Sequence, residues 1–183
     1  FVLRYLYLKN KEIFGKGIKK EQIFNLMPDK SIFNCIRCWN FIVKRKFLHL
    51  NNIYFKNIEI QEDVTFVSEL VCLAKSFKII EKPTHIYERY SPNSLSTTAG
   101  YIAVISHIKI IHEMGLFINK KKKFLNKLKI KFLFNMLRRS TESIFSDIVI
   151  CNPNEIIKAS KYLYKYNSTI LELSNFGFKK LLR

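Results

Sequence analysis

The chain has 183 residues, of which 48% are hydrophobic, and its 32 Lys and Arg residues against 14 Asp and Glu residues give a net charge of +18. This length and hydrophobic content exclude a disordered chain and are sufficient for one domain with a core. The charge indicates an anionic partner such as nucleic acid, phosphorylated sugars or an acidic lipid surface, and no run of about 18 uncharged apolar residues predicts a membrane-spanning helix.

The N-terminal part begins inside an apolar run. The letters "FVLRYLYL" from Phe1 alternate as in a strand, and we expect this strand to arrive from upstream sequence of a longer chain. A Gly-punctuated loop follows, and a short helical segment ends at Pro28. The segment "DKSIFNCIRCWNFIVKRKFLHLNN" then predicts a helix in its first half and a strand in its middle.

The four cysteines are Cys35, Cys38, Cys72 and Cys151. Cys35 and Cys38 form a C-x-x-C step, but no second Cys or His pair stands at a zinc-finger distance from it. We therefore expect buried thiols and a reducing, cytoplasmic compartment.

Two adjacent acids, Glu62 and Asp63, stand between a short extended segment and an amphipathic run. The apolar residues Val67, Leu70, Val71 and Ala74 recur at helical spacing, which predicts a helix from Val64. The acids would thus lie at an exposed helix N-terminus, where the helix dipole favours ionised carboxylates by roughly 0.3–1 kcal/mol each.

The segment "FKIIEKPTHIYERYSPNSLST" predicts a strand, a turn at Pro83, a second extended piece through Tyr90 and a polar loop. Beyond Gly100 the pattern becomes helical and strongly basic. The break near Gly100 predicts a mixed α/β part over residues 1–100 and a helical, basic C-terminal region over residues 101–183.

Four features taken in order, "CWNFIVKRKFL", "NNIYF", "QEDVTFVSELVCLAK" and "IIEKPTHIYERYSPNSLS", resemble the second half of the bacterial family 2 glycosyltransferases. The resemblance covers about Asn34 to Thr98. It implies an α/β fold, the second half of a Rossmann-like glycosyltransferase domain of the GT-A type. Residues 1–100 would then form the acceptor side of that domain and carry its general base.

The resemblance implies that the acid pair acts in catalysis. Asp63 would be the general base of an inverting glycosyltransferase that moves a sugar from a nucleotide-sugar donor to a surface-glycan acceptor, such as lipooligosaccharide, capsule or O-antigen. Glu62 would orient Asp63 or hold an acceptor hydroxyl. A carboxylate on an exposed helix start stays ionised at neutral pH and suits this task. The alternative is a helix cap without a catalytic role.

Four further residues are candidates for substrate binding. Trp39 would stack on the apolar face of an acceptor sugar, with a core position as the alternative. Tyr87, Arg89 and Ser94 border the polar loop, which could close over a nucleotide diphosphate and stabilise the departing phosphate. The alternative for Arg89 is a solvated strand edge.

The resemblance also implies a divalent metal, Mg²⁺ or Mn²⁺, held with the donor diphosphate by an Asp-x-Asp motif in an N-terminal half. This chain contains no Asp-x-Asp, and Asp29 is the only aspartate before the acid pair. We therefore expect the metal ligands to lie outside this chain, and the chain to be inactive on its own.

A basic run without any acid lies between Glu113 and Glu142, interleaved with Phe, Leu and Ile. Such a basic amphipathic helix suits the anionic inner face of the cytoplasmic membrane, as a peripheral contact. An ordinary surface helix and a basic nucleic-acid-binding module without enzymatic activity are the alternatives. The cationic residues of the run are Lys120, Lys121, Lys122, Lys123, Lys127, Lys129, Lys131, Arg138 and Arg139.

Overall fold

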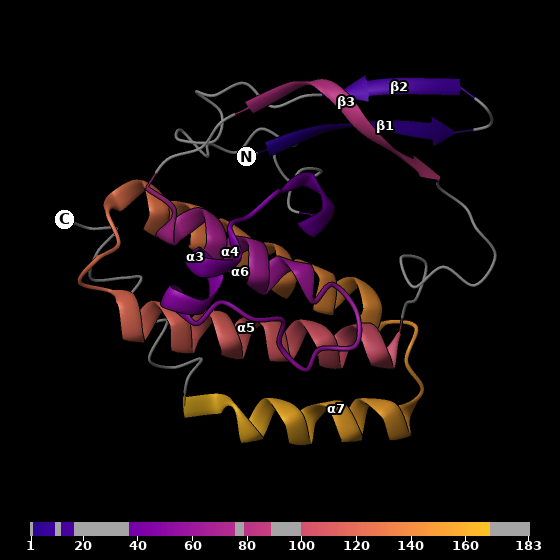
Figure 1. The fold of residues 1–183 in the computed structure, drawn as a ribbon. Coiled ribbons are helices and arrows are strands. Elements are labelled where there is room, and N and C mark those ends of the chain that lie inside the picture. Colours follow the sequence, from indigo (N-terminus) through magenta and orange to yellow (C-terminus); the bar gives the residue numbers. More distant parts are fainter. Residues whose placement is uncertain (1, 10–11, 17–36, 76–78, 89–99, 169–183) are drawn as a thin grey trace. The chain divides into compact units, whose positions relative to one another are not determined.

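The computed structural model describes residues 2–9, 12–16, 37–75, 79–88 and 100–168 (Figure 1). The chain divides into two compact units. The first contains residues 1–55 and 66–94, and the second contains residues 56–65 and 95–183.

The first unit contains three strands, β1 (Val2–Lys9), β2 (Glu12–Lys16) and β3 (Ile79–Glu88), in the sheet order β2-β1-β3. Strand β1 pairs antiparallel with β2 and parallel with β3. The register between β1 and β3 shifts on both sides of Arg4, which lies opposite Pro83. Proline has no N–H to give to a ladder, so an irregularity is expected at this point.

Two short helical elements follow in the same unit, the 3₁₀ turn η1 (Cys38–Asn40) and helix α3 (Arg45–Asn51). The 3₁₀ turn η1 lies in the middle of residues 29–52, where a strand was predicted, and helix α3 follows it. It ends at Asn52, whose φ of 54° lies in the left-handed region and whose N–H bonds to the His49 and Leu48 carbonyls. Asparagine adopts the left-handed conformation more readily than most residues, so Asn52 can end helix α3 at this point.

Helix α4 (Asp63–Leu73) confirms the helix predicted from Val64, and within it the chain passes from the second unit to the first. Val67, Leu70 and Val71 of the predicted apolar stripe are buried. In the first unit, the rings of Phe55 and Phe66 stack with their centroids 4.3 Å apart.

The second unit contains the long helices α5 (Tyr101–Lys121) and α6 (Lys127–Ile148) and the shorter α7 (Pro153–Lys165). Helix α5 packs against both others, with α6 and α7 running alongside it (Figure 1). The buried residues of α6 recur every three or four positions, so one face of this helix is buried. That face includes Ile130, Leu133, Leu137, Ser140 and Ile144.

Helix α5 is buried on nearly all sides, as its run of buried residues from Ala103 to Ile108 indicates. It begins after Gly100, whose φ of +77° favours glycine. Among the described residues it is the helix that is long and apolar enough to cross a membrane by length and composition. However, 67% of its apolar window is buried inside the protein, and a core helix has the same property.

The predicted α/β, Rossmann-like fold is wrong. Such a fold is built on a largely parallel sheet with helices on both faces. Where the structure describes side chains, at residues 37–39, 41–75 and 100–168, every regular element is a helix, and the core of the second unit is formed by helix-on-helix packing. The described strands form only a small three-stranded sheet of mixed direction, which is not the parallel sheet of such a fold. The fold is therefore helical rather than Rossmann-like.

Candidate functional site

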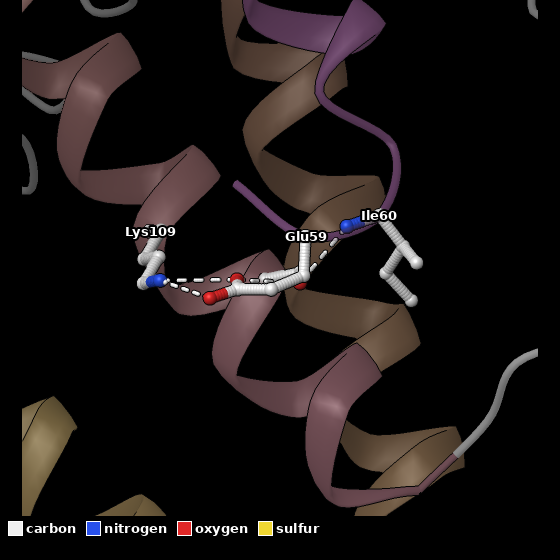
Figure 2. A network of polar contacts seen from close by, with 4 residues as sticks. Glu59, Ile60 and Lys109 are labelled. Atoms are coloured by element: carbon white, nitrogen blue, oxygen red, sulfur yellow. Dashed lines mark hydrogen bonds and ion pairs between the residues drawn. The ribbon is translucent and has the colours of Figure 1, made fainter. Parts of the chain in front are cut away.

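The segment that carries the acid pair is attached to α5 by a polar network (Figure 2). The Lys109 Nζ lies 2.7 Å and 3.0 Å from the two carboxylate oxygens of Glu59. The backbone N–H of Ile60 donates to Ser106 Oγ at 3.4 Å, and the Ser106 hydroxyl donates to Glu59 Oε2 at 3.5 Å. Because Ile58 and Ile60 are also buried, apolar contacts and polar bonds act together to hold this segment.

A further ion pair extends the attachment along α5. Lys56 Nζ lies 3.9 Å from Glu113 Oε2. Ile60 thus bonds to Ser106, Glu59 bonds to Ser106 and Lys109, and Lys56 pairs with Glu113. The segment therefore runs antiparallel to α5, and Ser106, Lys109 and Glu113 lie along one face of that helix.

Lys109 lowers the pKa of Glu59 through its hydrogen bond to the carboxylate, and this effect exceeds the opposing effect of partial burial. Sequence reasoning overlooked this pair. The signal was available, because Lys109 is the single basic residue other than histidine in the apolar run "YIAVISHIKIIHEMG".

The acid pair itself marks the start of α4. Gln61, with a φ of 58°, turns the chain, and its carbonyl accepts the N–H of Val64 at 3.0 Å. Glu62 stands immediately before the helix, where its carbonyl accepts the Thr65 hydroxyl at 3.1 Å. Asp63 is the first helical residue.

The two acids differ in exposure. Asp63 is only 3% exposed, whereas Glu62 is half-buried. The expectation of an exposed carboxylate at this helix start is therefore wrong for Asp63. Sequence patterning placed this residue at the edge of an amphipathic helix, but the described helix α4 is buried on its polar side as well.

Three more polar residues of α4 are buried, namely Thr65, Ser68 and Glu69. Glu69 is 6% exposed. Ser68 Oγ has no hydrogen-bond partner among the described residues. Buried polar side chains at this density are unusual for a helix that only fills a core, which makes α4 the strongest candidate for a functional element in the described chain.

The other predicted site residues fall into two groups. Trp39 lies in η1 and is half-buried, with the Arg37 guanidinium 5.7 Å from its ring centroid. Tyr87 lies in β3, opposite Tyr7 of β1. Trp39 and Tyr87 belong to the first unit, and Glu62 and Asp63 to the second. Arg89 and Ser94 lie outside the described residues.

The arrangement offers carboxylates for proton transfer. Within the described ranges, no group of three or more His, Cys, Asp or Glu side chains could hold a metal ion. The metal implied by the resemblance therefore has no fitting ligand set among those residues.

Comparisons with models of known protein families, with curated proteins and with solved structures found no match to this chain.

Proposed function

We propose that this chain contributes the acceptor side of an inverting glycosyltransferase and that Asp63 is its general base. The proposal is supported by the acid pair at the first turn of α4, preceded by a segment that Glu59, Ile60 and Lys109 fix to α5. It does not depend on a Rossmann-like architecture, because general-base catalysis requires a positioned carboxylate rather than a particular fold.

In the proposed reaction, the carboxylate removes the proton of an acceptor sugar hydroxyl while that oxygen attacks the anomeric carbon of the donor. The bond to the nucleotide diphosphate breaks on the opposite side, so the configuration inverts. Burial restricts the motion of Asp63 at the first residue of the helix. Glu62 has more exposed surface and would orient Asp63 or hold the acceptor hydroxyl.

The substrates proposed are a nucleotide sugar and a surface glycan such as lipooligosaccharide, capsule or O-antigen. The donor diphosphate and its divalent metal would be bound by residues outside this chain. The activity therefore belongs to the full-length gene product, which is the protein to assay.

Asp63→Asn in the full-length protein tests the proposal. Asparagine keeps the size of the side chain but cannot accept the proton, so the transfer rate should fall by roughly 10²–10⁴-fold. The melting temperature is measured for both proteins, so that a loss of rate caused by unfolding is distinguished from the loss of the base. The measurement is sugar transfer from a panel of nucleotide sugars to a purified glycan acceptor.

Glu142→Gln is the matched control, since it removes an exposed carboxylate of α6 that takes no part in holding the acid-pair segment. Its transfer rate should stay near that of the wild type. An Asp63→Asn rate within a factor of about three of wild type would refute the role of Asp63 as the base. If Glu62→Gln alone removes activity, the base is Glu62 instead.

A further inference from the structure

The turn between α5 and α6 concentrates positive charge at one end of the helical pair. Helix α5 ends at Lys121 and α6 begins at Lys127, so the basic run is not one continuous helix as its sequence predicts. No acidic residue occurs between Glu113 and Glu142. Seven lysines lie on or beside the turn, namely Lys120, Lys121, Lys122, Lys123, Lys127, Lys129 and Lys131. We call this surface the lysine turn.

Apolar side chains are exposed within the lysine turn. Phe124 is 75% exposed and Leu128 is 42% exposed. Leu125, the residue after Phe124, is by contrast 5% exposed. The turn thus places one large side chain inside the protein and its neighbour in solvent, which is an uncommon position for phenylalanine.

Local bonds fix this arrangement. The N–H of Phe124 donates to the Lys121 carbonyl at 2.8 Å. The Asn126 side chain caps α6 by accepting the Lys129 N–H at 3.0 Å. With Leu125 buried beneath it, the turn holds Phe124 outward before any partner binds, which reduces the entropy lost on association.

We propose that the lysine turn docks on a lipid bilayer with anionic headgroups, with Phe124 inserted between the lipids. The lysines complement the negative surface, while Phe124 and Leu128 enter the boundary of the acyl chains. An aliphatic side chain such as Leu128 gains from lipid contact but cannot stack on bases, which favours a membrane over a nucleic acid. This inference is independent of the proposed transfer reaction.

Co-sedimentation of the full chain with vesicles tests the docking. Vesicles of phosphatidylcholine containing phosphatidylglycerol should bind the protein, and binding should weaken as salt rises. Vesicles of phosphatidylcholine alone should bind it weakly. Equal binding to both compositions, or none to either, would overturn the proposal.

Phe124→Ser should weaken binding to the anionic vesicles by about tenfold or more, since the inserted side chain is lost. Phe145→Ser is the matched control, because Phe145 is 68% exposed but lies near the other end of α6. An equal loss in both variants would show that exposed apolar surface in general, and not the lysine turn, controls binding.

The charge contribution is tested by Lys122→Gln with Lys123→Gln. Each lysine removed near the membrane should weaken binding by about fivefold. The same pair of changes at Lys158 and Lys161 on α7 removes equal charge elsewhere and should have a smaller effect. Equal effects of the two pairs would contradict a local docking surface.

A spectroscopic variant separates lipid from nucleic acid. In a Trp39→Phe background, Phe124→Trp supplies the only tryptophan of the chain. Its emission should shift to shorter wavelength with anionic vesicles, because the ring leaves water. Single-stranded RNA that binds more tightly than the vesicles, and loses this binding in Phe124→Ser, would assign the surface to nucleic acid and overturn the lipid proposal.

Discussion

His107 of α5 is a buried ionisable residue that the proposed reaction does not use. It is 2% exposed, and its Nδ1 has no hydrogen-bond partner in the described part of the chain. Removal from water lowers the pKa of His107, although the charge of Asp147 opposes this effect. The folded protein therefore keeps the imidazole neutral at pH values where the unfolded chain protonates it.

The sign of the resulting pH dependence follows from this lowered pKa. As pH falls below the unfolded pKa of about 6.5, only the unfolded state takes up the proton, so the free energy of unfolding decreases. The slope is at most about 1.4 kcal/mol per pH unit for one proton. His107→Gln should reduce this slope between pH 7 and pH 5 in urea titrations. An unchanged slope would show that other groups dominate.

The ion pair of Glu59 and Lys109 gives a second prediction for single residues. Because the pair is partly exposed, Lys109→Met should lower the free energy of unfolding by about 0.2–1 kcal/mol. The lowered pKa of Glu59 means that this contribution is present above about pH 4.5 and is lost as pH falls through the folded pKa. A double-mutant cycle with Glu59→Gln, measured at pH 7 and pH 3, isolates it. A coupling energy equal at both pH values would contradict the assignment.

At the scale of elements, α7 depends strongly on its N-terminal cap. Only Ala159 of this helix is buried, so packing contributes little. Asn152 accepts the Glu155 N–H at 3.1 Å, and the Glu155 carboxylate accepts the Asn152 N–H at 2.9 Å, with Pro153 at the first turn. At its other end, Tyr166 stacks on His112 of α5 with ring centroids 4.2 Å apart.

Asn152→Ala should therefore destabilise α7 by about 1 kcal/mol. The change removes the bond from the Glu155 N–H to the Asn152 side chain and so breaks the reciprocal pair of the capping box. Amide hydrogen exchange should become faster in α7 while that of α5 and α6 stays unchanged. Asn154→Ala is the matched control, because Asn154 is exposed and makes no cap bond. Faster exchange in all three helices would indicate that α7 unfolds together with its neighbours.

For the whole molecule, the sequence was sufficient to predict the helix from Val64 and the helical region beyond Gly100, because apolar spacing is a local property. The fold class was not predictable in this way. The middle of residues 29–52, where a strand was predicted, contains the 3₁₀ turn η1. The Arg45–Asn51 segment after it is rich in Arg, Lys and Leu, which favour a helix, and the left-handed Asn52 ends it.

The candidate site, too, was predictable from the sequence only in its local features. The order of residues indicated Glu62 and Asp63 as a helix start, which the structure confirms. Burial of Asp63 and Glu69, and attachment of Glu59 to Lys109, depend on segments distant in sequence. Such contacts leave no periodic signal in a single sequence. The lysine turn was visible as charge, but the outward position of Phe124 required the helix ends to be known.

The antiparallel attachment of residues 56–60 to α5 has a consequence for synthesis on the ribosome. Ser106, the partner of Ile60, lies 46 residues later in the chain, and Lys109, the partner of Glu59, lies 50 residues later. Neither contact can form until those residues have been synthesised. At about 5–20 residues per second, this delay is roughly 2–10 s. During that time Ile58 and Ile60 have emerged without the surface that buries them, so the nascent chain has a defined interval in which chaperones that bind short apolar segments can compete with folding.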